Sequence, residues 1–184
     1  MTNLRKISTG FSLLEVLITV VILATGLLSL TGLQLTSTKN THNALLETKA
    51  RYIATTLLNK IRDNPQGLAD YLINGATYSC SGAPTPSCIS TAVNTTACTA
   101  TELAVSEKYQ AVCGSTVGSI TSGGVKNELP NASMNVQCIA ADGSFSLNAT
   151  DCATGDVSIS ISWGERNLTG GGTSQRTIRI TGSI

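Results

Sequence analysis

The first strong pattern in the chain is a long run of apolar residues near the N-terminus. From Val16 to Leu35 there are twenty residues without a charge. In a helix that rises about 1.5 Å per residue, this run is about 30 Å long, which matches the hydrocarbon core of a bilayer. The run therefore predicts a membrane-spanning helix, which we place at residues 11–35.

A second helical pattern follows, with apolar residues on one face only. They recur at intervals of three or four residues: Leu46, Ala50, Ile53, Leu57 and Ile61. This spacing is typical of an amphipathic helix that packs on a domain. Pro65 disfavours helix at the residue before it, so we expect an amphipathic stem over residues 36–62. Between the two patterns, Gly26, Gly32 and a run of Thr, Ser and Asn predict a bend or local melting.

The remaining residues, 63–184, indicate a small mixed head. Residues 66–98 are dense in Gly, Pro, Ser and Thr and are expected to form a loop. Thr99 and Glu102 form a capping box that starts a short helix at about 99–113. Alternating apolar residues then predict strands, and they make Trp163 a core residue. The segments are SMNVQC, DVSISISW and RTIRITG. The predicted fold class is α+β, with a long N-terminal helix packed on a small antiparallel β-sheet domain.

The cysteines indicate where the head is located. All six follow the predicted long helix and none forms a C-x-x-C pair: Cys80, Cys88, Cys98, Cys113, Cys138 and Cys152. The only histidine is His42, so neither a metal site nor a cofactor site is expected. Disulfides in an oxidising compartment are the better interpretation, and they place the head outside the cytoplasm.

Helix geometry limits the possible pairings. A helix that separates Cys98 from Cys113 holds them about 22 Å apart, whereas bridged Cα atoms lie less than about 7 Å apart. Cys138 and Cys152 flank a loop and are expected to pair. Two arrangements then remain open for the other four: Cys80–Cys98 with Cys88–Cys113, or Cys80–Cys113 with Cys88–Cys98.

Charge and composition argue against several functions. Residues 36–62 carry five basic and one acidic residue, a net charge of +4, whereas residues 63–184 carry five basic and nine acidic residues, a net charge of −4. With few aromatic residues as well, the head is not a nucleic-acid platform. A single histidine cannot supply a Ser-His-Asp triad elsewhere in the chain, and we identify no catalytic constellation.

Glu15 is the anomaly in the apolar run. A charged residue inside a membrane segment costs about 2.5 kcal/mol or more, so it suggests a function. Alternatively, Glu15 lies at the membrane interface and stays hydrated.

The residues around Glu15 carry a resemblance to a known family. KISTGFSLLEVLI resembles the signal of the type IV pilin family: a basic leader, Gly, then F-[ST]-L-[LIV]-E. The resemblance implies that a prepilin peptidase removes the cytoplasmic leader, residues 1–10, by cutting after Gly10 and then methylates the new amine of Phe11. Glu15 would pair with the Phe11 amine of a neighbouring subunit, since a buried carboxylate is costly unless paired.

Two later segments resemble one branch of that family. NKIRDNPQGLADY is similar to the RxNPxG segment of PilV-type minor pilins, the type IV pilus modification proteins, and ISISWGER is similar to their strand ending in Trp. The resemblance implies a non-enzymatic minor pilin, held in the bacterial inner membrane with a periplasmic head and later found in the pilus at the cell surface. There it would help to initiate assembly with other minor pilins and the major pilin, in or near the tip, and would support adhesion or twitching motility.

Two alternatives stay open. One is a minor pseudopilin of a type II secretion system, whose helix would look the same. The other is a signal-anchored periplasmic binding protein or enzyme, which would not need the Gly10–Phe11–Glu15 pattern.

Overall fold

The computed structural model describes residues 12–88, 97–117, 120–152, 155–166 and 172–184. The chain divides into two compact units, one that ends at Asn43 and one from Ala44 to Ile184. We call the second unit the head domain and consider each unit by itself.

One helix, α1, covers Leu13–Asp63. Residues 26–43 are helical throughout, so the local melting predicted for this link is wrong. The hydroxyls that were expected to disturb the helix instead donate to carbonyls of the preceding turn: Thr36 to Gly32 at 3.1 Å, Thr38 to Gln34 at 2.9 Å and Thr41 to Ser37 at 3.0 Å. Two glycines cost only about 1 kcal/mol each, which is too little to interrupt a long cooperative helix.

The head contains a four-stranded antiparallel sheet with the order β4-β3-β5-β6. The strands are β3 (Ser133–Ile139), β4 (Phe145–Ser146), β5 (Asp156–Arg166) and β6 (Thr173–Ser183). Strands β5 and β6 pair over their whole length, and Ile73 adds one further bridge to Val136 of β3. The three alternating segments of the sequence are therefore strands, and the α+β fold class is confirmed.

The core lies between the sheet and the part of α1 that belongs to the head. The helix buries Leu46, Ala50, Ala54, Leu57, Leu58 and Ile61. The sheet buries Met134, Val136, Val157, Ile159, Ile161, Trp163 and Ile178. Trp163 is fully buried, as predicted. At the end of β6, a Cβ on Gly182 would lie 2.7 Å from the side chains of Leu58 and Arg62, so a larger residue there would require these two side chains to move.

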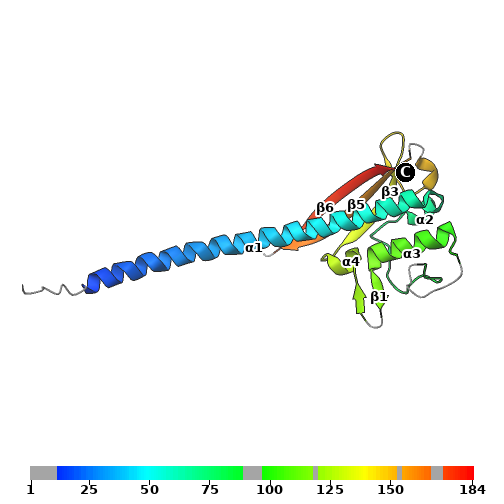
Figure 1. Cartoon of the computed structure of the whole chain (residues 1–184). Helices are drawn as coiled ribbons and strands as arrows, with labels where there is room; N and C mark the ends of the chain where they lie inside the picture. Colours follow the sequence, from blue (N-terminus) through cyan, green and yellow to red (C-terminus); the bar gives the residue numbers. More distant parts are fainter. Residues whose placement is uncertain (1–11, 89–96, 118–119, 153–154, 167–171) are drawn as a thin grey trace, which may run out of the picture. The chain divides into compact units, whose positions relative to one another are not determined.

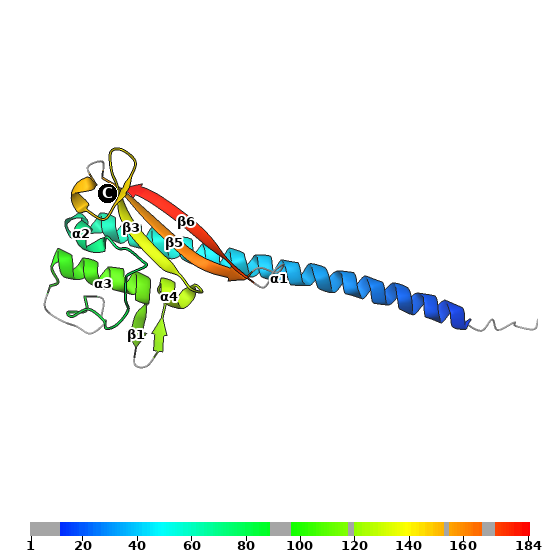
Figure 2. The same ribbon diagram turned by 180° about the vertical axis from the view of Figure 1, so that it is seen from behind.

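Short elements surround this core. After α1 come η1 (Pro65–Gly67) and α2 (Leu68–Tyr71), so the predicted loop of residues 66–98 begins with helical turns. The capping box of Thr99 and Glu102 starts α3 (Ala100–Cys113) where the sequence predicted it. In Figures 1 and 2, the sheet and α3 flank the end of α1 on opposite sides.

Several further elements were not predicted. They are a hairpin of β1 (Ser115–Val117) and β2 (Ile120–Ser122), the single turn α4 (Val125–Glu128), the two-residue strand β4, and η2 (Ala149–Asp151). The described hairpin residues are largely exposed and show no apolar alternation, which explains why the sequence pattern did not reveal them.

Candidate assembly interface

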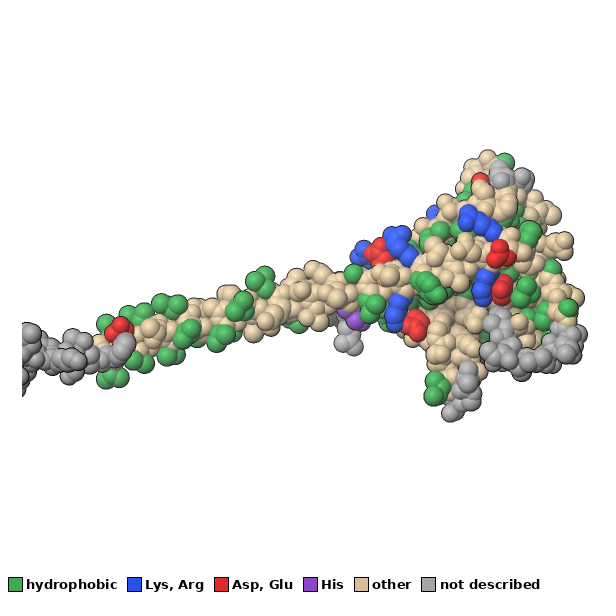
Figure 3. All heavy atoms as spheres, viewed as in Figure 1, with side chains coloured by type: hydrophobic (Ala, Val, Ile, Leu, Met, Phe, Trp, Pro, Cys, Tyr) green, Lys and Arg blue, Asp and Glu red, His purple; other side chains and the backbone are tan. Residues whose placement is uncertain are grey.

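The helical segment before the head presents an apolar surface with no cover within the described residues. Its large hydrophobic side chains are between about half and nine-tenths exposed: Leu13, Leu14, Val16, Leu17, Ile18, Val20, Val21, Ile22, Leu23, Leu27, Leu28, Leu30, Leu33 and Leu35. By length and composition this is one candidate membrane span. In Figure 3, hydrophobic side chains follow the visible face of this segment. Such a surface requires lipid or other apolar helices around it.

Most polar side chains within this segment form hydrogen bonds to carbonyls of their own helix. Thr19, Thr25 and Thr31 donate their hydroxyls to carbonyls three residues earlier, at 2.8–3.0 Å. Ser29 donates to Thr25 at 3.1 Å. Because these groups have partners on their own helix, they can enter an apolar environment at little cost.

Glu15 differs from them. It lies in the first turn of α1, where the helix dipole favours a negative charge. Its side chain is exposed and has no hydrogen bond or ion pair within the described part of the chain. Gly10 and Phe11, the other two residues of the predicted processing site, lie outside the described residues. As far as the described residues go, the structure thus places a carboxylate without a partner at the start of an uncovered apolar helix.

The head carries three disulfides. Cys138 pairs with Cys152, and the remaining cysteines adopt one of the two arrangements left open by the sequence: Cys80–Cys113 and Cys88–Cys98. Cys98 lies two residues before α3, Cys113 is its last residue, and the two belong to different bridges. The Cys80–Cys113 bridge therefore ties the loop after α2 to the end of this helix, and the Cys88–Cys98 bridge joins two positions of the loop ahead of its start.

A polar cluster joins the same loop and helix to the stem. The hydroxyl of Tyr71, on α2, donates a hydrogen bond to the Glu107 carboxylate of α3. Lys60 of α1 lies 3.7 Å from Glu107, and Asn64 donates to the carbonyl of Ala100 at 2.8 Å. Burial and the neighbouring Glu107 carboxylate raise the pKa of Tyr71 well above its ordinary value. No local sequence pattern marks this cluster, because Tyr71 and Glu107 are 36 residues apart.

Ion pairs at the surface connect other parts of the head. Glu47 accepts from Arg51 at 2.8 Å and from Arg176 of β6 at 3.3 Å, and the bond from Arg51 is the main cause that lowers its pKa. Lys49 pairs with Glu128 of α4 and lowers the pKa of that carboxyl. The side chains of these pairs remain partly open to solvent, which screens their charges, so the pairs orient the elements more than they stabilise the fold.

The architecture, a long N-terminal helix on a small antiparallel sheet domain, is that of a type IV pilin. Two family models match adjoining parts of the chain. The prokaryotic N-terminal methylation motif matches residues 5–31, and the model described as type IV pilin Tt1218 matches residues 32–108. No curated protein and no solved structure matches the chain.

The matches and the fold agree with each other. The chain is a member of the type IV pilin superfamily. Type IV pilins are structural subunits, and the methylation motif implies processing by a prepilin peptidase and assembly into a pilus with other pilins. The motif and the apolar helix also fit anchoring in a membrane.

Proposed function

We propose that this chain is a minor pilin of the type IV pilus, which helps to initiate pilus assembly and is located in or near the tip. The observation that carries the proposal is an apolar helix that no other described residues cover, with Glu15 at its start and no partner for this carboxylate among the described residues. Lipid covers this helix before assembly, and the helices of other pilins cover it afterwards. A subunit that forms such heterologous contacts can extend an open helical filament.

The methylation-motif match supports the processing steps that we propose for the N-terminus. Prepilin peptidase cuts after Gly10 on the cytoplasmic face of the inner membrane and methylates Phe11. The head remains in the periplasm until the subunit enters the pilus. Its three disulfides suit that oxidising compartment.

In this proposal Glu15 selects the correct register between neighbouring pilin subunits. Its carboxylate pairs with the Phe11 amine of a neighbouring pilin, and a wrong register leaves the carboxylate buried without a partner. Because that state costs several kcal/mol, the pairing rejects wrong registers more than it adds stability.

Two segments favour a minor pilin. Residues 59–71 and 159–166 resemble the corresponding segments of PilV-type minor pilins. The former segment contains the end of α1, η1 and α2, and it supplies Asn64 and Tyr71 to the polar cluster. The second candidate, a minor pseudopilin of a type II secretion system, would have the same helix. The long disulfide-bonded loop after α2 argues against it.

The test is deletion of the gene, followed by complementation with the wild type, with Glu15→Ala and with Glu47→Ala. We expect deletion to reduce the number of pili counted by electron microscopy while the major pilin remains in the membrane. Wild type and Glu47→Ala should restore the count. Glu15→Ala should insert into the membrane but enter sheared pili poorly.

Three results would contradict these proposals. Normal piliation and motility after deletion would reject the initiating role. Loss of type II secretion with normal piliation would identify a pseudopilin instead. Normal recovery of Glu15→Ala in sheared pili would reject the pairing role of Glu15.

A further inference from the structure

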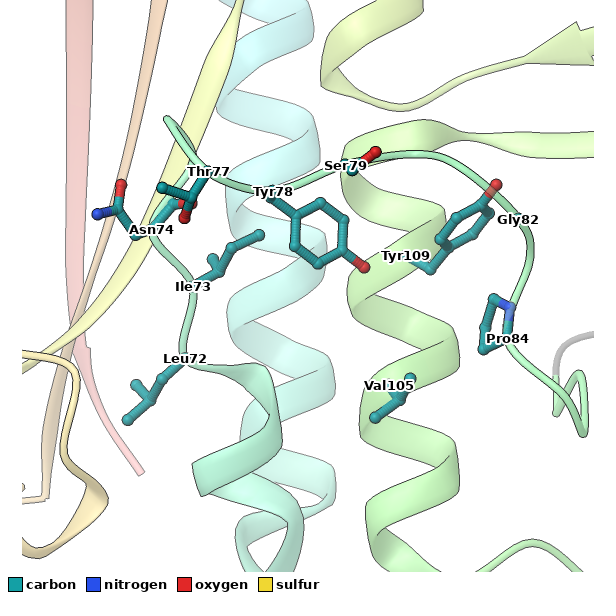
Figure 4. Close-up of a pocket in the computed structure, with 10 residues that line it drawn as sticks. All are labelled: Leu72, Ile73, Asn74, Thr77, Tyr78, Ser79, Gly82, Pro84, Val105 and Tyr109. Carbon is teal, nitrogen blue, oxygen red and sulfur yellow. The ribbon is translucent and has the colours of Figure 1, made fainter.

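The head contains a hollow of about 370 Å³ that the assembly role does not use. It lies between the loop after α2 and one face of α3, as Figure 4 shows. Tyr78 stands on the loop and Tyr109 on α3, with Pro84 and Val105 beside them. This volume falls in the lower part of the range of about 300–1,000 Å³ that is usual for small-molecule sites.

The lining combines aromatic rings with neutral polar groups. Asn74, Thr77 and Ser79 line the hollow together with the two tyrosines, and none of the described lining residues is charged. Two lysines lie next to it. Lys126 donates to the carbonyl of Tyr78 at 2.6 Å, and Lys108 donates to the carbonyl of Asp70 and lies 5.9 Å from the centre of the Tyr78 ring. Because the described side chains that line the hollow are all neutral, it offers a ligand no charged partner of its own and suits a ligand without net charge.

Some of these polar groups have bonding capacity left. Asn74 accepts from the backbone of Ala76 at 3.1 Å through its side-chain oxygen, while its amide NH₂ has no partner within the described residues. The hydroxyl of Tyr78 likewise has none there. An amide and a phenol can both donate to the hydroxyl groups of a ligand.

The walls are fixed before any ligand arrives. The Cys80–Cys113 disulfide ties the loop to the end of α3, and the Tyr109 hydroxyl donates to the carbonyl of Cys80 at 3.4 Å. Thr77 donates to the carbonyl of Asn74 at 3.2 Å, which closes the turn between them. Preorganised walls reduce the ordering cost of binding.

We infer that this hollow is a binding site for a neutral carbohydrate. A sugar ring has an apolar C–H face and an equatorial rim of hydroxyls, so it matches a site that offers aromatic faces beside uncharged donors and acceptors. The site is distinct from the apolar helix, so the inference goes beyond the proposed assembly role and does not depend on it. It would give a pilus subunit the means to contact glycans on a surface.

The experiment measures binding of lactose, N-acetyllactosamine and chitobiose to the full-length chain in detergent micelles, by saturation-transfer NMR and calorimetry. We expect saturable binding of at least one of them, with a Kd on the order of 1 mM and little dependence on salt. Tyr78→Ala should weaken it by about tenfold or more, because it removes a stacking surface. Asn74→Ala should also weaken it, and being exposed it should leave the fold intact.

The matched control is Tyr52→Ala, a tyrosine that is 70% exposed on the stem and does not line the hollow. It should bind as the wild type does. The inference is overturned if the folded chain binds none of these sugars, or if Tyr78→Ala and Asn74→Ala bind as well as Tyr52→Ala does.

Discussion

Tyr71→Phe tests how the polar cluster holds the head together. The side chain of Tyr71 is fully buried, and its hydroxyl donates to the Glu107 carboxylate, whose side chain is only 14% exposed. Removing the hydroxyl leaves this carboxylate with Lys60 at 3.7 Å as its remaining charged partner. A hydrogen bond to a charged group contributes about 1.5–3 kcal/mol, so we expect the free energy of unfolding to fall by about 2 kcal/mol.

The assay is urea unfolding of the full-length chain in detergent micelles with the disulfides intact, followed by the fluorescence of Trp163. This is the only tryptophan and it is fully buried in the head core, so its emission reports on unfolding of the head. With a slope of about 2 kcal/mol per molar urea, the midpoint should fall by about 1 M. Tyr52→Phe, which alters an exposed tyrosine, should stay within about 0.5 kcal/mol of wild type.

The pH dependence gives a second, independent measurement. Because the folded state raises the pKa of Tyr71 above its ordinary value of 10.0, the unfolded chain loses the proton first as the pH rises. The contribution of Tyr71 is therefore complete below about pH 10 and declines above it. The difference between wild type and Tyr71→Phe should shrink between pH 10 and 11, while Tyr52→Phe follows the wild type. A midpoint for Tyr71→Phe equal to that of Tyr52→Phe at pH 8 would refute the role of the cluster.

Three further predictions concern processing, packing and the disulfides. Mass spectrometry of the mature chain should find a methylated Phe11 at the N-terminus, and a retained leader would contradict the signal assignment. Gly182→Val should destabilise the head by about 1–3 kcal/mol in the same fluorescence assay, since a Cβ there lies 2.7 Å from the side chains of Leu58 and Arg62 on α1; an unchanged midpoint would show that these two side chains make room at no cost. Replacing Cys80 and Cys113 together by serine should cost about 3 kcal/mol and speed proteolysis of the loop after α2, and protease resistance equal to wild type would contradict its dependence on this bridge.

The sequence predicted the elements whose signals are local. The apolar run and the amphipathic stripe indicated α1, and Thr99 with Glu102 indicated α3, because periodicity and capping depend on neighbours in the chain. Strands β3, β5 and β6 followed from their alternating residues. The hairpin of β1 and β2 has no such alternation, so no local signal marked it.

Long-range partners could not be read in this way. The sequence excluded Cys98–Cys113 by helix length, yet the choice between the last two pairings depends on which part of the loop reaches each end of α3. The hollow between Tyr78 and Tyr109 has the same origin, since it exists only where the loop lies against that helix. The prediction of local melting in residues 26–43 was wrong for another reason. The weak helix propensity of these residues was overridden by the cooperativity of a helix of 51 residues.

Two of the three disulfides lie where the apolar core is thin. On the sheet side, seven buried side chains of β3, β5 and β6 face the stem, and the Cys138–Cys152 disulfide adds to this packing at the end of β3. On the other side, α3 buries only Ala104, Ser106, Val112 and Cys113, which are small or medium-sized side chains with little apolar area. The Cys80–Cys113 and Cys88–Cys98 bridges and the Tyr71–Glu107 bond all act on this side. Covalent and polar links thus replace buried area there, and they leave its surface free to form a hollow without loss of the fold.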